Sequence, residues 1–137
     1  MQNNKKRSNA MNYLGAVLAG FNLEAVNEDD EKLISLYSVN QREQFLALLD
    51  EFIKIEPFSQ PSSYLIPILI LEHYLKDESE RFDEIFEGLI FREELVDGRV
   101  FMRTLLEHLK GLVGDLSLED LTKSERAMFN YQKARVL

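Results

Sequence analysis

The residues of this chain best suited to chemistry are a dense run of carboxylates between positions 77 and 97. The run reads DESERFDEIFEGLIFREELVD and contains nine acidic and two basic residues, a local charge of −7 in a chain whose net charge is −8. Carboxylates at such density can bind metal ions, act as general acids and bases, or attract a positively charged protein surface. Their spacing helps to decide between these roles.

The spacing of these acids favours a binding surface. Four of them, from Glu80 to Glu87, recur at i, i+3, i+4 and i+7, so on a helix they share one face. Apolar residues with the same period take the other face, which is the pattern of an amphipathic helix. We therefore predict exposed carboxylates on an ordered helix, with Phe91 and Phe82 as aromatic anchors for a partner. The candidate partner-binding residues are Asp77, Glu80, Asp83, Glu84, Glu87, Phe91, Glu93, Glu94 and Asp97.

The two histidines are the next candidates, because each directly follows a glutamate. Neighbouring residues on a helix point in different directions, so Glu72 and His73 cannot hold one ion together, and the same applies to Glu107 and His108. The Glu-x-x-His spacing of helical di-metal sites does not occur. If their two helices pack antiparallel, the two imidazole rings could still approach each other. We expect a structural role for both histidines, with Glu72 paired to Lys76 at i+4.

Other catalytic signatures do not occur in the sequence. The chain has no cysteine, which excludes disulfides, thiolate metal ligands and cysteine nucleophiles. It contains no G-x-S-x-G turn, no glycine-rich phosphate-binding loop and no calcium-loop spacing. We therefore predict a protein that is not an enzyme, with no catalytic residue, no metal and no cofactor. A carboxylate and histidine metalloenzyme is the class that the sequence favours least.

Length and charge narrow the kind of partner. With 137 residues, 45% hydrophobic and 29% charged, the chain has the composition of one soluble globular domain. A net charge of −8 disfavours direct binding to nucleic acid or to an anionic membrane, because both require lysine and arginine. The balance favours a basic protein as the partner, and a cytoplasmic location.

The N-terminus has features of a signal peptide without meeting its requirements. A basic segment, residues 1–7, precedes an apolar run over residues 13–21, but acids follow at once and nine residues cannot span a bilayer. The Ser-Asn-Ala sequence before Met11 is typical of a cloning junction. We predict a disordered or tag-like segment over residues 1–11 and a single helical domain over residues 12–137.

The rest of the chain has helical periodicity, with loop signals between the apolar runs. Residues 64–71 are almost all apolar, and we predict a central helix capped by Ser63, although a strand is the alternative. A helix over residues 99–113 is expected to end at Gly114. A capping box of Thr122 and Glu125 opens a last helix. We expect its inward residues to be Met128, Tyr131 and Ala134.

These elements predict an all-α fold, an irregular bundle of about six or seven helices. A weak internal similarity between residues 70–74 and 105–109, offset by 35 positions, also permits a short array of helix pairs.

The acidic run suggests the function. A charged run can simply keep a helix solvated, but seven net charges in 21 residues repel one another, and a basic partner would relieve that repulsion. We therefore expect a non-catalytic protein that neutralises a basic partner, most naturally an immunity protein inhibiting a nuclease-type toxin. One alternative is an acidic mimic of nucleic acid. Another is a helical scaffold or homo-oligomer that associates through residues 13–21 and 64–71.

Overall fold

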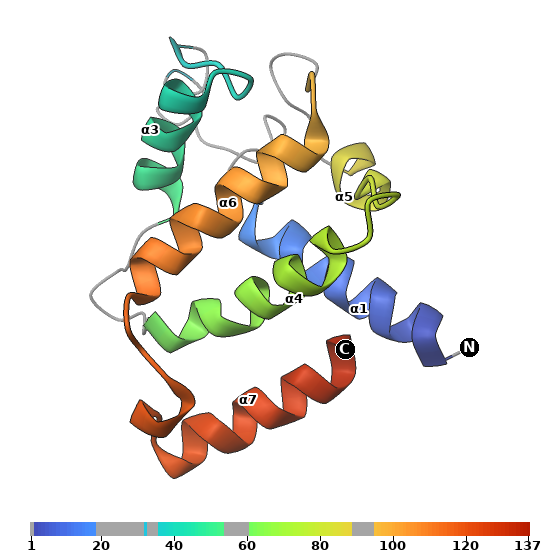
Figure 1. Cartoon of the computed structure of the whole chain (residues 1–137), viewed down its shortest axis with the longest axis vertical. Helices are drawn as coiled ribbons and strands as arrows, with labels where there is room; N and C mark the ends of the chain where they lie inside the picture. The colour runs from blue at the N-terminus through green and yellow to red at the C-terminus, as the bar shows by residue number, and fades with distance from the viewer. Residues whose placement is uncertain (1, 19–31, 33–35, 54–60, 89–94) are drawn as a thin grey trace.

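The computed structural model consists of helices joined by turns and loops, as Figure 1 shows. It describes residues 2–18, 32, 36–53, 61–88 and 95–137. The elements in these ranges are the α-helices α1 (Gln2–Val17), α3 (Arg42–Phe52), α4 (Leu65–Leu75), α5 (Asp83–Glu87), α6 (Gly98–Val113) and α7 (Lys123–Val136), and the 3₁₀ helices η2 (Pro61–Tyr64) and η3 (Leu118–Asp120). No strand occurs within these ranges, which confirms the all-α prediction.

Helix α4 is the centre of the bundle and packs against α6, α1 and α7. Its apolar sequence explains this position, because Ile66, Ile70 and Leu71 are all buried among other helices. Pro67 lies in the first turn, where its missing N–H removes no helical hydrogen bond. The expected cap from Ser63 is wrong, since the helix follows the 3₁₀ turn η2 and Tyr64 occupies the N-cap without a side-chain bond. Despite its apolar character, neither α4 nor any other described helix could cross a membrane.

Helix α6 packs on both α4 and α3, and its boundaries follow local signals in the sequence. The Asp97 carboxylate accepts hydrogen bonds from the backbone N–H groups of Arg99 and Val100, which fixes the first turn. Gly114 ends the helix with φ of 58°, a conformation that glycine adopts without steric cost. The predicted end of this helix is therefore confirmed.

The N-terminal segment differs from the sequence expectation. The tag-like alternative and the single domain over residues 12–137 stay predictions, whereas residues 2–11 belong to α1, which differs from the disorder expected over residues 1–11. The reason is that Ala10, Met11 and Leu14 all face the core and are buried, which ties the preceding turns to the domain. Helix α1 packs against α7, α4 and α5, and the Asn9 side-chain amide donates to the Arg135 carbonyl oxygen at 3.1 Å.

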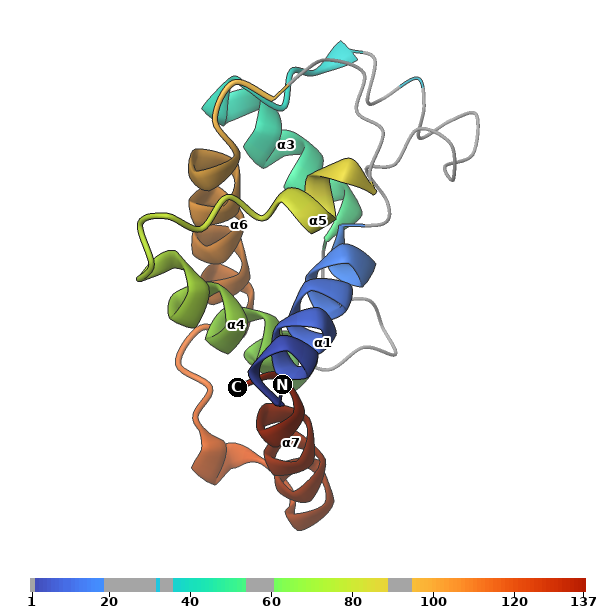
Figure 2. The same cartoon turned by 90° about the vertical axis from the view of Figure 1, so that its right-hand side faces the viewer.

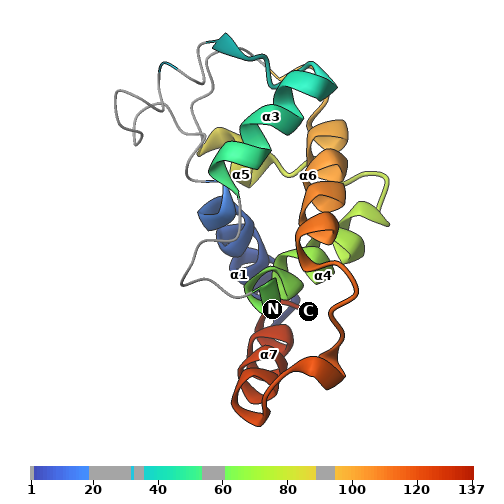
Figure 3. The ribbon, with the colours of Figure 1, turned by 90° about the vertical axis from the view of Figure 1, so that its left-hand side faces the viewer.

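Helix α7 lies at the lower end of the molecule in Figures 1, 2 and 3. The predicted capping box is present, since Thr122 and Glu125 bond to each other's backbone N–H groups. The predicted inward face is wrong: Met128 is 56% exposed, Tyr131 is 60% exposed and Ala134 is also exposed. The helix contacts the domain instead through a narrow stripe formed by Glu125, Phe129, Gln132 and Val136.

Candidate functional site

The acidic stretch at residues 77–97 is not one continuous helix in its described part. Its only helix there is α5, which runs from Asp83 to Glu87. The residues between α4 and α5 form a turn, so Glu80 does not share a helical face with the acids that follow it. Three predicted site residues, Phe91, Glu93 and Glu94, lie outside the described ranges.

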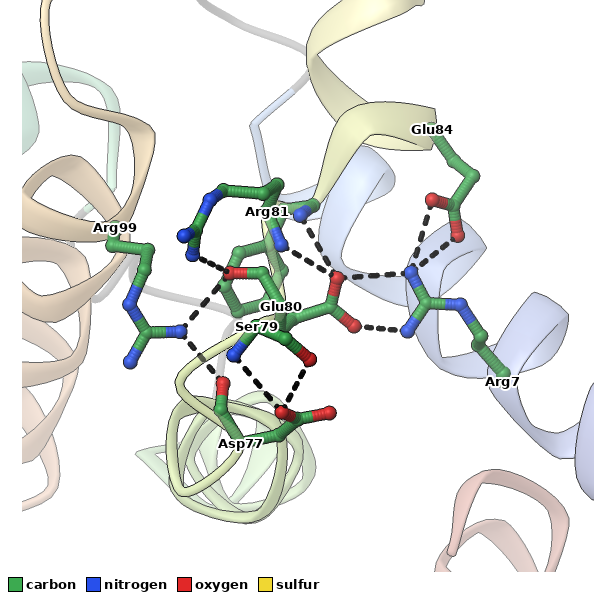
Figure 4. A network of polar contacts seen from close by, with 8 residues as sticks. Arg7, Asp77, Ser79, Glu80, Arg81, Glu84 and Arg99 are labelled. Atoms are coloured by element: carbon green, nitrogen blue, oxygen red, sulfur yellow. Dashed lines mark hydrogen bonds and ion pairs between the residues drawn. The ribbon is translucent and has the colours of Figure 1, made fainter.

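Glu80 is a buried structural residue, which corrects its prediction as an exposed acid. It is 8% exposed, and its carboxylate accepts hydrogen bonds from the backbone N–H groups of Arg81 at 2.9 Å and Phe82 at 3.0 Å. Both oxygens also accept from the Arg7 guanidinium, as Figure 4 shows. Burial acts to raise the pKa of this carboxyl, but the bonds from Arg7 and from the two amides outweigh it and lower the pKa.

Phe82 is not an exposed anchor either. Its side chain is fully buried, and its backbone is left-handed with φ of 56°. This conformation costs a non-glycine residue on the order of 1 kcal/mol. Burial of the ring and the bond from the Phe82 N–H to Glu80 offset that cost. The result is a sharp turn that directs the chain into α5.

Two arginines bind the backbone carbonyls at the end of α4 and in the turn that follows. The guanidinium of Arg99, on α6, donates to the carbonyl oxygens of Leu75, Asp77 and Glu80 at 2.9, 2.9 and 3.0 Å. The Arg81 guanidinium donates to the carbonyl oxygens of Glu78 and Glu80. In Figure 4, Glu80 lies between two cations, with its carboxylate towards Arg7 and its carbonyl towards Arg99. The Leu75 carbonyl, which α4 leaves without a helical partner, is thereby satisfied, and the other bonds hold the turn.

Asp77 and Asp97 are exposed but serve the local backbone. Asp77 accepts from the Ser79 hydroxyl at 2.6 Å and from the Ser79 N–H at 3.0 Å, and these bonds lower the pKa of its carboxyl. Asp97 caps α6 through the N–H groups of Arg99 and Val100. Both were predicted to contact a partner, and in the structure both have a bond that stabilises a turn or a helix end.

In the described part of the acidic stretch, the exposed carboxylates that remain are those of Glu78, Asp83, Glu84 and Glu87. Glu84 forms an ion pair with Arg7 at 2.8 Å. Within the described part of the chain, the other three side chains make no hydrogen bond or ion pair. Three of these four residues were candidates from the sequence, and Glu78 is an addition. These four are called the exposed acids below.

The histidines lie in separate surroundings. His73 is exposed, and its ring meets Tyr74 edge-on at a centroid distance of 4.8 Å. The His108 ring is mostly buried against α3, with Nε2 2.7 Å from the carbonyl oxygen of Ile53 and Nδ1 3.5 Å from Asp50. Glu72 pairs with Lys110 at 3.8 Å rather than with Lys76 as expected. The described residues include no group of three or more side chains placed to hold a metal ion.

Sequence reasoning missed the residues that organise this region. Arg7 and Arg99 come from α1 and α6, far along the chain from the turn that they bind. Tyr74 lies under the Arg7 guanidinium, with its ring centroid 5.6 Å from the Arg7 Cζ atom. No local pattern indicates these contacts, because Arg7 is 73 positions from Glu80 and Arg99 is 19 positions from it.

Comparisons with known protein families, with curated proteins and with solved structures found no match to this chain. What the chain binds therefore has to be inferred from its own residues.

Proposed function

We propose that this chain is a non-catalytic binding protein that uses its exposed acids to neutralise a basic protein partner. The observation that supports this is the bracing of the backbone beneath them. Glu80, Arg81 and Arg99 fix the turn between α4 and α5: the Glu80 carboxylate accepts from backbone N–H groups, and the two guanidiniums donate to backbone carbonyls. A surface held in place before binding loses less conformational entropy when a partner docks.

The charge of the whole chain favours the same kind of partner. A net charge of −8 attracts a basic protein over the range set by ionic strength, which raises the rate of encounter. Glu84 already accepts the guanidinium of Arg7, so the surface is chemically suited to an arginine side chain. A basic partner would meet unpaired carboxylates on Asp83 and Glu87 of the same short helix.

Within this class, an immunity protein against a nuclease-type toxin fits best. Nucleases bind phosphates through clusters of lysine and arginine, and such a cluster is the complement of a small carboxylate surface. A mimic of nucleic acid would need charges spaced like phosphates along an extended surface, whereas the exposed acids fall within ten positions, from Glu78 to Glu87. This compact group favours a plug that closes one site.

The scaffold alternative is less favoured because its interface residues are used internally. In the two apolar segments expected to associate, Leu14, Leu18, Ile66, Ile70 and Leu71 are all buried in the core of the same chain. Association through them would require part of the domain to open.

The test is capture of a partner by two charge-matched variants. The first replaces three exposed acids, E78Q, D83N and E87Q, and leaves Glu80 and Glu84 in place because both bind Arg7. The control variant, E43Q, D115N and E119Q, makes the same charge change at exposed positions outside the acidic stretch. Lysate from the source cells is passed over each immobilised protein at low and high salt, and captured proteins are identified and assayed for nuclease activity.

The proposal expects a basic protein to be retained by the native chain and the control, lost from the first variant, and released by salt. Its nuclease activity should fall when the native chain is added at an equal concentration. Equal capture by all three proteins would show that the exposed acids do not bind the partner. Capture of a basic protein without nuclease activity would retain the binding function and remove the toxin-immunity assignment.

A further inference from the structure

The guanidinium of Arg7 occupies a site whose walls come entirely from other parts of the chain. It is contacted by both oxygens of Glu80, from the turn before α5, and by Glu84, from α5 itself. The ring of Tyr74, on α4, faces it at 5.6 Å. Helix α1 contributes only the occupant, so the site formed by Glu80, Glu84 and Tyr74 is complete without it. We call these three residues the guanidinium site.

The site is built for a guanidinium in particular. Two parallel N–H bonds to one carboxylate match the planar fork of arginine, and the same plane can interact with an aromatic face. A lysine ammonium is a point charge and cannot make both bonds in this geometry. Glu80 is held in position independently of Arg7, because the backbone N–H groups of Arg81 and Phe82 bind the same carboxylate.

Arg7 can leave this site without undocking its helix. Its side chain is 33% exposed, so it borders solvent. Helix α1 is anchored further along by the buried residues Ala10, Met11 and Leu14. Opening the site therefore requires the bonds from Arg7 to Glu80 and Glu84 to break, but no movement of these buried residues, and a second guanidinium entering the site would restore the charge balance around Glu80.

We propose that the guanidinium site binds an arginine side chain of the basic partner, and that Arg7 is its intramolecular competitor. This inference takes the existence of a basic partner from the proposed function, but the site itself can be tested without one. An incoming arginine can bind only while Arg7 is out of the site, so its apparent affinity is the intrinsic affinity multiplied by the fraction of time that the site is empty. A partner that binds must then present arginine, not lysine, next to the exposed acids.

The test is chemical rescue of the full-length variant R7A. Thermal unfolding is followed by circular dichroism with increasing propylguanidinium, a mimic of the arginine side chain, and with propylammonium at equal ionic strength. At ten times its dissociation constant, propylguanidinium should raise the unfolding midpoint of R7A by about 4 °C. The native protein, whose site is filled, and the double variant R7A/E80Q should show no such rise.

Three results would contradict the proposed guanidinium site. Equal shifts with the ammonium compound, or equal shifts in R7A and in R7A/E80Q, would mean a general salt effect without a guanidinium site. If R7A proves unfolded, the readout becomes recovery of helical signal on addition of propylguanidinium, and no recovery would count against the proposal. R7K provides a second variant, in which a smaller shift is expected because its ammonium competes weakly.

A partner, once identified, separates this inference from the proposed function. Its affinity for R7A should be about tenfold higher than for the native chain, since the competitor is removed. Replacement of its contacting arginine by lysine should weaken binding to both. Rescue without any basic partner would leave the guanidinium site standing and remove the function, whereas a partner indifferent to R7A and E84Q would bind elsewhere on the acidic surface.

Discussion

The turn between α4 and α5 and the helix α7 are both rich in charge, but they use it in opposite ways. In the turn, Asp77, Glu80, Arg81 and the incoming Arg99 bind backbone groups of the turn itself. Helix α7 carries four basic residues and one acid, and the side chains of two of the four, Lys123 and Lys133, make no hydrogen bond or ion pair within the described residues. The charged side chains of the turn bind the backbone of the turn, whereas many of those on α7 are exposed to solvent.

The cause of the difference is the state of the backbone. A regular helix pairs its own N–H and C=O groups except at the ends, so the charged side chains along α7 have few backbone groups left to bind. A turn that leaves one helix and enters another has unpaired groups on both sides, and side chains are drawn to them. Charge density in a sequence therefore indicates a display surface only where the backbone is already satisfied.

The largest expected effect separates Glu80 from its exposed neighbours. Glu80→Ala removes the bonds to Arg7 and leaves the buried N–H of Phe82 without a partner, so we expect a loss of about 3 kcal/mol of unfolding free energy. The matched change Glu87→Ala, at an exposed acid, should stay within about 0.5 kcal/mol. Urea denaturation followed by circular dichroism measures both, and equal losses would contradict the distinction drawn between the two acids.

A second test concerns the cations. Arg99→Met keeps the aliphatic stem but removes the bonds to three carbonyls, which should cost about 2 kcal/mol. Arg103 lies one turn further along α6 at an exposed position, so Arg103→Met should leave the unfolding free energy nearly unchanged. If both variants unfold at the same urea concentration as the native chain, Arg99 does not brace the turn.

Helices α6 and α7 should respond alike to loss of their N-cap side chains. Asp97→Ala and Thr122→Ala each remove a side chain that accepts a backbone N–H at a helix start, and each should cost about 1 kcal/mol. This pair sharpens the comparison, because the start of α7 at Thr122 has unpaired backbone N–H groups, as the turn between α4 and α5 does. Heat denaturation of the two variants measures both losses. An unchanged midpoint for Asp97→Ala would mean that Asp97 does not stabilise α6 and should be grouped with the exposed acids.

The smallest expected effect is a contribution to acid sensitivity. The pKa of the Glu80 carboxyl is lowered from its ordinary value of 4.5 in the folded state, so the unfolded chain binds more protons at acid pH. The stability from this carboxylate is present above that value and is lost as the pH falls through the lowered one. Stability should fall less between pH 5 and 3 in E80Q than in the native chain, as measured by urea midpoints at each pH. Parallel curves for both proteins would assign the acid sensitivity to other groups, such as Asp77 and Glu125, whose pKa values are also lowered.

The parts of the fold that the sequence predicted are those with local causes. The apolar run that became α4, the glycine that ends α6 and the capping box that opens α7 each act within a few residues. The prediction of one acidic helix was wrong because the left-handed backbone at Phe82 interrupts it. A phenylalanine in the sequence does not indicate such a turn. The bond between Arg7 and Glu80 joins residues 73 positions apart, and no periodicity describes such a pairing.

The inward face of α7 was also beyond prediction from spacing. Apolar residues occur at Met128 and Tyr131 and also at Phe129 and Val136, so two faces of the helix compete. Packing against α1 decides between them, with the Tyr13 hydroxyl bonded to Gln132 at 3.1 Å. The function stays a prediction, since it depends on a partner.

The contact between α1 and α7 has a consequence for how the protein is made. Asn9 and Arg135, which are hydrogen-bonded in the folded chain, are 126 positions apart. At ordinary rates of synthesis, α1 emerges from the ribosome about 6 to 25 seconds before α7. During that interval α1 can pack against α4 and α5 but not against α7, so the part of its surface that α7 later covers stays exposed to chaperones and proteases.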